Sequence, residues 1–262
     1  MSDLPEETKR VHTRLLRCTL EAENSRAYWQ HAAHASGPVT AKLAFEEYWF
    51  GAKSLGRAEL LIANFRARFD AFPPALRVLS DWADMDPDAR RLVCHWHLQL
   101  SDPLYRAFTG SFLPARHDGG RTTVTHDLVV TWVGEQDSGR WNMATRIQFA
   151  SKLLSAALAA GLVGSSRDPR PLTYPYVGEE PLTYLLYLLR GVAFEGTLVE
   201  NPYLASVGLS GPELDDRLRT LSALKFQRQG KLVDFGWRYP DLRTWADFAL
   251  NEQPRARAGG RR

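Results

Sequence analysis

Histidine and cysteine are the residue types in this sequence that could bind a metal ion. Cys94, His95 and His97 are close together in the sequence, and both residue types ligate zinc. Residues one or two positions apart on a helix point in different directions, so this spacing favours a packed cluster over a metal site. His31 and His34 lie three residues apart, but no nearby cysteine or acidic pair completes a ligand set. We therefore expect no metal and no other cofactor.

Acidic pairs and catalytic motifs give no sign of an enzyme. Glu46 and Glu47 form a candidate acid–base pair in the stretch FEEYWF. Adjacent residues on a helix face different directions, so we expect this pair to be solvated. The sequence contains no phosphate-binding loop, no dinucleotide-binding glycine fingerprint and no G-x-S-x-G nucleophile motif. We expect a protein that is not an enzyme.

A binding function is indicated by residues 140–164, RWNMATRIQFASKLLSAALAAGLVG, which are expected to be helical. The apolar positions of the expected buried face are Ile147, Ala150, Leu154, Ala157 and Leu158. Polar side chains at spacings of three, four and three form a second face: Thr145, Gln148, Lys152 and Ser155. Such side chains contact phosphates and base edges, and Arg140 and Arg146 flank them. Asn142 is the expected N-cap and Gly161 the expected C-cap.

The neighbouring segments predict a winged helix. A helix over about 124–135, capped by Thr123 or Thr125, comes before the polar helix, and a tight turn joins the two. Residues 164–178 are rich in glycine, serine, proline and tyrosine, which suits two short extended segments joined by a turn. Arg167 and Arg170 lie on this expected wing, from which they could reach phosphate. In a helix-turn-helix, the second helix can enter the major groove through its N-terminal residues.

The remaining periodicity predicts a mainly α fold. Helices are expected over 7–36, 40–50 and 58–72, and further helices begin near Pro74, Pro87 and Asp102, with no strand before residue 120. A loop at 116–121 marks a boundary.

Near the C-terminus, a helix over 210–224 precedes a hairpin over 224–239 that turns at Gln229-Gly230. Three acidic residues stand near the start of that helix, where a phosphate would otherwise bind: Glu213, Asp215 and Asp216. This second module is expected to be structural or to bind protein.

These boundaries divide the chain into four parts. We expect a helical domain over 1–120, a winged-helix domain over 121–178 and a helical region with a second, degenerate winged helix over 179–253. The last part, 254–262, carries four arginines and no acidic residue, including Arg255 and Arg257. This composition predicts a disordered tail that could act as an electrostatic arm.

The composition is that of a globular protein with a mildly basic charge. Of the 262 residues, 44% are hydrophobic, and the formal net charge is +3. This charge permits a nucleic-acid partner without requiring one. Only two cysteines occur, which fits a reducing cytosol. No apolar run reaches the roughly 18 residues needed to span a bilayer, and the polar start MSDLPEETKR is unlike a signal peptide. We expect a cytoplasmic protein with no membrane partner.

Four stretches resemble the BrxA family of BREX phage-defence systems. In chain order they are KSLGRAELLIANFRARFDAF (53–72), DARRLVCHWHLQLSDPLYRAFTGSFL (88–113), RWNMATRIQFASKLLSAALAAGLV (140–163) and FGWRYPDLRTWADF (235–248). Their order and separation carry the resemblance, and they are spread over most of the chain, from residue 53 to residue 248. The resemblance implies a mostly helical, non-enzymatic DNA-binding accessory protein with a NusB-like N-terminal region followed by winged-helix elements. It also implies partners among the other BREX subunits.

The leading hypothesis is a component of a BREX-type defence system that contacts duplex DNA mainly through the backbone. The expected DNA-binding residues are Arg140, Thr145, Arg146, Gln148, Lys152, Ser155, Arg167, Arg170, Arg255 and Arg257. One alternative is an adaptor whose winged helices bind partner proteins. Another is an RNA-binding protein that acts through its NusB-like half. The sequence leaves open whether the chain forms homo-oligomers.

Overall fold

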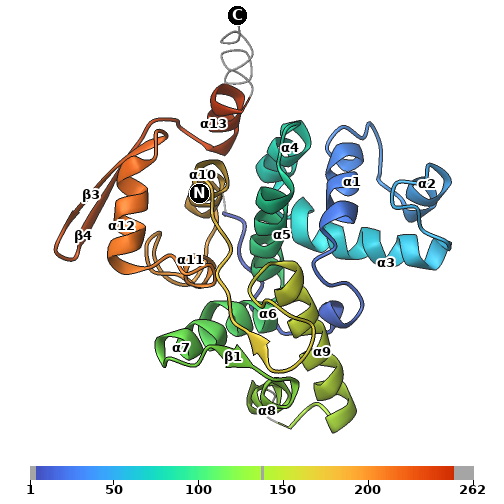
Figure 1. Cartoon of the computed structure of the whole chain (residues 1–262). Helices are drawn as coiled ribbons and strands as arrows, with labels where there is room; N and C mark the ends of the chain where they lie inside the picture. The colour runs from blue at the N-terminus through green and yellow to red at the C-terminus, as the bar shows by residue number, and fades with distance from the viewer. Residues whose placement is uncertain (1–3, 137–138, 251–262) are drawn as a thin grey trace, which may run out of the picture.

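Helices make up most of the computed structural model, which describes residues 4–136 and 139–250 (Figure 1). The helices of the first half are α1 (Ala22–Ala32), α2 (Ala41–Glu46), α3 (Leu55–Phe65), α4 (Pro73–Asp81), α5 (Pro87–Ser101), α6 (Pro103–Ala107) and α7 (Leu113–Asp118). A 3₁₀-helix, η1 (Arg14–Leu16), precedes them, and π-helical turns continue α3 and α6 as η2 (Arg66–Asp70) and η3 (Phe108–Phe112). The expected mainly α class with short hairpins is confirmed.

The helix starts follow from local capping. The side chains of Asp86 and Asp102 accept hydrogen bonds from backbone N–H groups in the first turns of α5 and α6. A proline follows each cap, at a position where its missing N–H costs nothing. Thr40 and Ser54 cap α2 and α3 in the same way. The helices predicted from residue 40 to residue 102 are therefore confirmed near their expected starts.

The single helix predicted over 7–36 is wrong. Helix α1 begins only at Ala22, and from residue 4 to residue 21 the only helical segment is η1. Tertiary partners take up the backbone hydrogen bonds there: Glu7 N–H donates to the Ala193 carbonyl at 3.0 Å, and Thr8 N–H donates to Leu100 at 2.8 Å. The Glu7 carboxylate is also buried, where it accepts from the Tyr203 hydroxyl. These long-range bonds override the local helical pattern.

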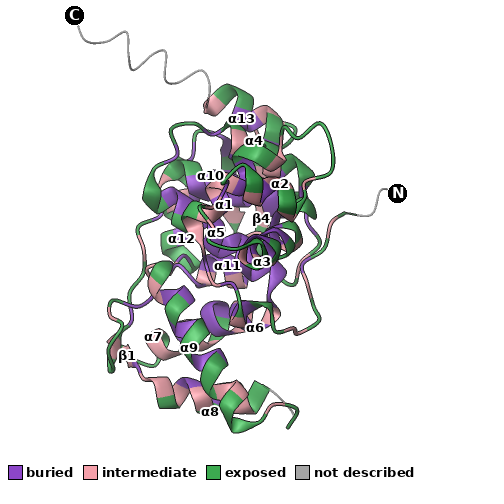
Figure 2. Cartoon of the chain, turned by 90° about the vertical axis from the view of Figure 1, so that its right-hand side faces the viewer, coloured by how far each residue is buried: buried purple, intermediate pink, exposed green. Residues whose placement is uncertain are grey.

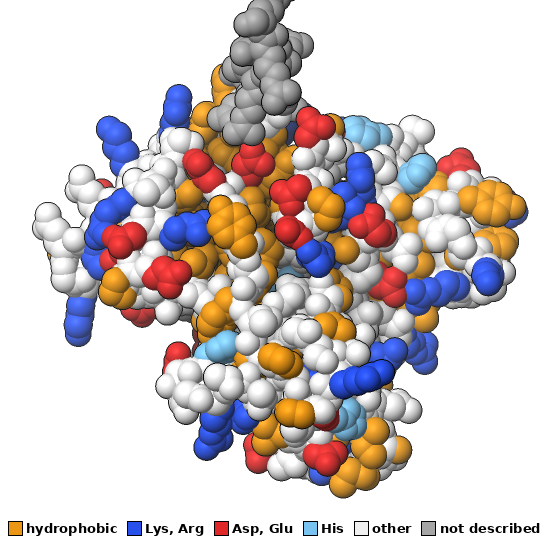
Figure 3. Space-filling view, in the orientation of Figure 1, with side chains coloured by type: hydrophobic (Ala, Val, Ile, Leu, Met, Phe, Trp, Pro, Cys, Tyr) orange, Lys and Arg blue, Asp and Glu red, His pale blue; other side chains and the backbone are white. Residues whose placement is uncertain are grey.

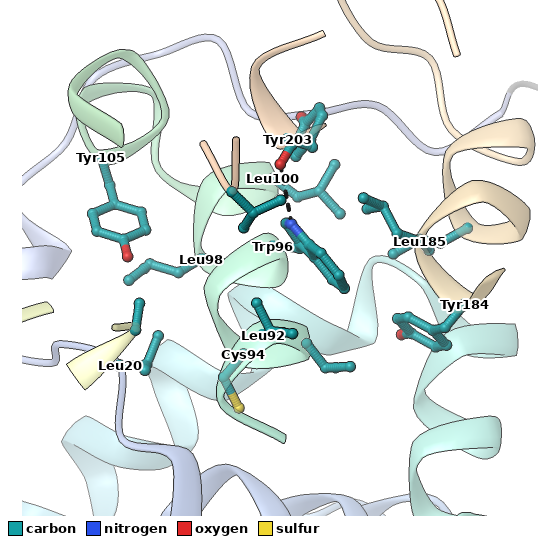
Figure 4. Packing of buried hydrophobic residues seen from close by; sticks show 14 of the residues in the cluster. Leu20, Leu92, Cys94, Trp96, Leu98, Leu100, Tyr105, Tyr184, Leu185 and Tyr203 are labelled. Atoms are coloured by element: carbon teal, nitrogen blue, oxygen red, sulfur yellow. Dashed lines mark hydrogen bonds between the residues drawn. The ribbon is translucent and has the colours of Figure 1, made fainter. Parts of the chain in front are cut away.

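Helix α5 lies at the centre of the molecule, and nearly all of its residues from Ala89 to Ser101 are buried. Trp96 projects from it toward Leu185 and Tyr184 of α10 (Glu179–Arg190), and its ring N–H donates to the Tyr203 carbonyl at 3.2 Å (Figure 4). Buried residues run through the middle of the molecule (Figure 2). They form one hydrophobic cluster that extends from Leu15 to Ala246. The division into domains at residues 120 and 178 stays a prediction.

The second half continues with β1 (Thr123–Val124), α8 (His126–Gln136), α9 (Met143–Ala159), β2 (Arg170–Pro171), α10 (Glu179–Arg190), α11 (Pro202–Ala205), α12 (Gly211–Thr220), β3 (Leu224–Gln229), β4 (Leu232–Trp237) and α13 (Leu242–Ala249). The predicted hairpin is confirmed as the antiparallel pair of β3 and β4. Its last pair is Gln229 with Leu232, so the loop is Gly230-Lys231, one residue later than expected. Gly230 has a φ of 61°, which glycine adopts without strain. None of the described helices is both long enough and apolar enough to cross a membrane.

One close backbone approach fixes the distance between η3 and α11. A Cβ atom on Gly110 would lie 2.4 Å from the Pro202 Cβ atom and 2.7 Å from the Pro202 carbonyl oxygen. Such a contact can be relieved only by moving the backbone. We expect Gly110→Ala to lower the free energy of unfolding by about 1–3 kcal/mol, as overpacking of a core does. Urea denaturation of the variant and the parent measures this.

Gly56, in the first turn of α3, is the matched control. A Cβ atom there would have no neighbour within 4 Å. Gly56→Ala should leave the stability unchanged or raise it by up to about 1 kcal/mol, because alanine favours helix. Equal stability of the two variants would contradict the close approach at Pro202.

Candidate nucleic-acid interface

Helices α8 and α9 pack against each other at the end of the molecule opposite α13 (Figures 1 and 2). The chain reaches them from α7 through β1, and it leaves α9 into a short hairpin. In this hairpin Gly164 N–H donates to the Pro171 carbonyl at 2.8 Å, and Thr173 N–H donates to the Leu162 carbonyl at 3.1 Å. Strand β2 also pairs with β1, so that Val124 lies opposite Arg170. Helix, strand, helix, helix and hairpin follow one another in the order expected of a winged helix.

The ends of α9 are set by the expected residues. Asn142 Oδ1 accepts a hydrogen bond from Thr145 N–H at 2.9 Å, as an N-cap does. At the other end Gly161 has a φ of 78°. Its N–H donates to Leu158, and Leu162 N–H donates to Ala157, which is the Schellman pattern. Both caps are confirmed.

The buried face of α9 differs from the expected stripe. Its buried residues are Phe149, Ala150, Leu153, Leu154, Ala156 and Ala157. Ile147 was expected in the core but is 43% exposed. Phe149 takes its place, with its ring 4.3 Å from the ring of Trp141. Helix α9 also packs against η1 of the N-terminal segment, so its buried face is wider than one stripe.

The polar face of α9 lies mostly where it was expected. Gln148, Lys152 and Ser155 are exposed, and Thr145 is half-buried. No acidic residue occurs anywhere in α9. Since phosphate is repelled by carboxylates, this helix presents a surface compatible with a polyanion.

Two of the expected cationic contacts are engaged within the protein. Arg146, which was expected to flank the polar face, is half-buried. Its Nε donates to the Trp141 carbonyl at 3.0 Å, and a Cβ atom on Gly134 of α8 would lie 2.9 Å from its guanidinium. The guanidinium of Arg140 lies 5.6 Å from the centre of the Trp141 ring. Arg146 therefore helps to hold α8 against α9.

Asp168 ties the wing to the start of α8. Its carboxylate accepts from the His126 N–H at 2.6 Å and from Arg170 Nε at 2.7 Å. The hydrogen bond from Arg170, and next that from His126, hold the pKa of Asp168 below its usual value. The Arg170 side chain is only 14% exposed, so it positions the wing, whereas Arg167 is exposed. Of the two predicted caps of α8, Thr125 accepts from Leu128 N–H, and Thr123 lies in β1.

The N-terminal segment adds cations that the sequence reasoning missed. Because η1 packs against α9, it brings exposed Arg14 and Arg17 to this end of the molecule. Residues 8–20 contain no acid, and this basic run was the available signal. Because a single amphipathic helix was predicted over 7–36, this basic run was not identified as a separate surface. Lysine, arginine and acidic side chains are otherwise interspersed over the face drawn in Figure 3.

The second module, formed by α12 and the β3–β4 hairpin, contains ion pairs between its own residues. Asp215 of α12 is buried, and Arg228 Nε of β3 lies 2.9 Å from its carboxylate. Arg219 pairs with Asp216 on the same helix. Two of the three acidic residues of α12, Asp215 and Asp216, thus pair with cations within the module.

The histidines of α5 are packed, as their spacing predicted. The His95 ring is bonded to Tyr105 at 2.8 Å and to Ser206 at 2.9 Å. His97 contacts the Arg68 carbonyl at 3.1 Å and the Tyr184 hydroxyl at 2.7 Å. Burial lowers the pKa of His95 to about 3 and that of His97 to about 4. Over the described ranges, no three or more His, Cys, Asp or Glu side chains gather as metal ligands would.

Comparison with known proteins bears on the fold alone. No protein-family model matches the chain, and no curated protein matches it at a significant level. A crystal structure of an uncharacterized protein from Magnetospirillum magneticum is similar, with a TM-score of 0.57 and 13% sequence identity. The similarity covers 70% of this chain and 97% of that chain. The expected contacts at Arg255 and Arg257 lie outside the described residues.

The two faces of α9 predict opposite phenotypes. Leu154 is fully buried, so Leu154→Ala should lower the free energy of unfolding by about 2–5 kcal/mol. Lys152 is exposed, so Lys152→Ala should change it by less than about 0.5 kcal/mol. Urea denaturation of both variants measures the difference. If Leu154→Ala and Lys152→Ala lost similar amounts of stability, this would contradict the placement of Leu154 on the buried face of α9 and Lys152 on the exposed face.

The Asp168 link predicts a pH dependence. Its folded-state pKa is depressed, so the ionised carboxylate contributes stability above the usual aspartate value of about 3.9. This contribution is lost as the pH falls through the depressed pKa. We expect the parent to be more stable than Asp168→Asn at about pH 5–7, and the difference to shrink below about pH 4. Thermal melts over this range test it, and a difference that persists undiminished at acid pH would contradict an ionic role.

Proposed function

We propose that this chain is a non-enzymatic protein that binds duplex DNA through the winged helix of residues 121–178. The observation that carries the proposal is the exposed, acid-free face of α9, with the wing and η1 beside it. A helix held in this way can enter the major groove through its N-terminal half, while a wing contacts the backbone. We also propose, from the resemblance of four stretches to the BrxA family, that it serves a BREX-type defence system with other BREX subunits as partners.

The number of exposed cations sets the expected strength of the electrostatic contribution. Arg14, Arg17, Lys152 and Arg167 are exposed, and within the described residues none of their side chains forms an ion pair. Lys152 and Arg167 belong to the winged helix, and the other two lie on the segment packed against it. Four phosphate contacts give a slope of log K against log salt of about −3.6. This corresponds to a loss of about 100-fold in affinity between about 50 and 200 mM salt.

An adaptor function is the alternative, and one observation favours it. Met143 and Ile147 are large apolar side chains on the same exposed face, with exposed fractions of 60% and 43%. Exposed apolar side chains are found where proteins bind partners. In that case a partner protein, not DNA, would cover α9.

A salt titration of Lys152→Ala separates the two functions. Loss of one phosphate contact should weaken binding to a labelled duplex and reduce the salt slope by about 1. Fluorescence anisotropy at four or more salt concentrations measures both quantities. The matched control is Lys231→Ala, which removes the same charge from the exposed loop of the β3–β4 hairpin. The control should bind as the parent does.

Two results would count against the proposal. If the parent does not bind duplex at low salt, DNA is not the partner of this surface. If Lys152→Ala binds as the parent does and Lys231→Ala does not, the contact lies on the second module.

A further inference from the structure

We propose that α9 reads A·T base pairs in the major groove, with Gln148 bonding to the adenine edge and Ile147 and Met143 contacting the thymine methyl group. This inference rests on the proposed duplex binding. It adds base recognition to a contact that the sequence alone suggested would be mainly to the backbone.

The placement of these three side chains carries the inference. Met143, Ile147 and Gln148 all lie in the first two turns of α9, which is the part of a recognition helix that meets base edges. Met143 and Ile147 are four residues apart, so they lie one above the other on the same face. Gln148 follows directly and is also exposed.

The hydrogen bonds of the neighbouring side chains leave Gln148 as the available base-reading group. Ser151 donates to the Ile147 carbonyl at 2.9 Å, and its hydroxyl lies 3.0 Å from His126 Nε2. Thr145 is half-buried, and the amide oxygen of Asn142 is already bonded as the helix cap. The Gln148 amide, in contrast, has no hydrogen-bond partner among the described residues. Its donor and acceptor can together bond to N7 and N6 of adenine.

The apolar pair complements this amide. Among the four bases, only thymine presents a methyl group in the major groove, and apolar side chains contact it. An adenine–thymine pair thus offers both an amide partner and an apolar partner on one groove edge. Gln148 and Ile147 are adjacent on the helix and point about 100° apart, so they would reach neighbouring base pairs of one A·T step, not the same pair.

Charge favours DNA over a protein as the occupant of this face. Helix α9 has no acidic residue, and Lys152 stands four residues beyond Gln148 on the same face. Exposed Arg167 is on the adjoining wing. Helix α12 of the second module, by comparison, has acidic residues in its first turns. A helix face that carries an amide and a lysine in line, with no carboxylate, is compatible with base edges bordered by phosphates.

Modified bases test the inference directly. Short duplexes of equal length are compared at one salt concentration: one rich in A·T pairs, one rich in G·C pairs, one with uracil for thymine and one with 7-deazaadenine for adenine. The parent should bind the A·T duplex at least about fivefold more tightly than the G·C duplex. Uracil removes only the methyl group, and 7-deazaadenine removes only N7. Each should lower the affinity of the parent.

Variants assign each effect to a side chain. Ile147→Ala should lose the sensitivity to uracil and keep the sensitivity to 7-deazaadenine, and Gln148→Ala should do the reverse. Leu232→Ala is the control, since Leu232 is a 77% exposed apolar side chain on the other hairpin. It should behave as the parent does. Thermal melts of all three verify the fold.

The outcomes distinguish the inference from the proposed function. Equal affinity of the parent for all four duplexes overturns base reading while duplex binding stands. An A·T preference that survives both base modifications also overturns it, because the preference then arises from groove shape. Absence of binding to any duplex overturns the proposed function as well, and Met143 and Ile147 are then assigned to a protein partner.

Discussion

The burial of α5 on every side is the constraint on which the rest of the structure depends. A helix in this position cannot leave polar side chains in contact with water, so each must find a partner in another segment. His95 reaches Ser206, His97 reaches Tyr184, and Gln99 reaches the Pro202 carbonyl. These bonds attach α10 and α11 to the centre. The carbonyl of Ser101 is bonded to His12 at 2.8 Å, which fixes the N-terminal segment.

The candidate interface depends on the same framework. His12 and Thr8 hold the N-terminal segment to the end of α5, and η1 follows immediately. Helix α9 then packs against η1. The direction in which α9 presents its exposed face is therefore set partly by bonds to α5, far from α9 in the sequence. The hairpin after α9 is fixed by a bond to a nearer segment, from the His126 N–H at the start of α8 to Asp168.

Sequence reasoning succeeded where the chemistry is local. Asn142, Gly161 and the prolines after Asp86 and Asp102 mark helix ends through bonds within a few residues. It failed where distant partners decide, as at Glu7, whose N–H bonds to Ala193 and whose buried carboxylate bonds to Tyr203 in place of a local helix.

The face of Ile147 was misjudged for a related reason. Most positions of α9 are apolar or alanine, so the pattern fits several rotations of the helix equally well. Packing against both α8 and η1 selects one of them. The engagement of Arg146 and Arg170 was also missed, although each bonds to a residue close by in the sequence, Trp141 and Asp168. Their burial depends on longer-range packing, which for Arg146 is the contact with Gly134 of α8.

The arrangement around α5 has a consequence for how the chain folds during synthesis. The hydrogen-bond partners of its polar side chains are Tyr184, Pro202 and Ser206. These residues leave the ribosome about a hundred residues after α5 itself. Until then the helix exposes apolar surface and unsatisfied polar groups. High contact order of this kind slows folding. The nascent N-terminal helices are therefore the part of the chain with most need of a chaperone.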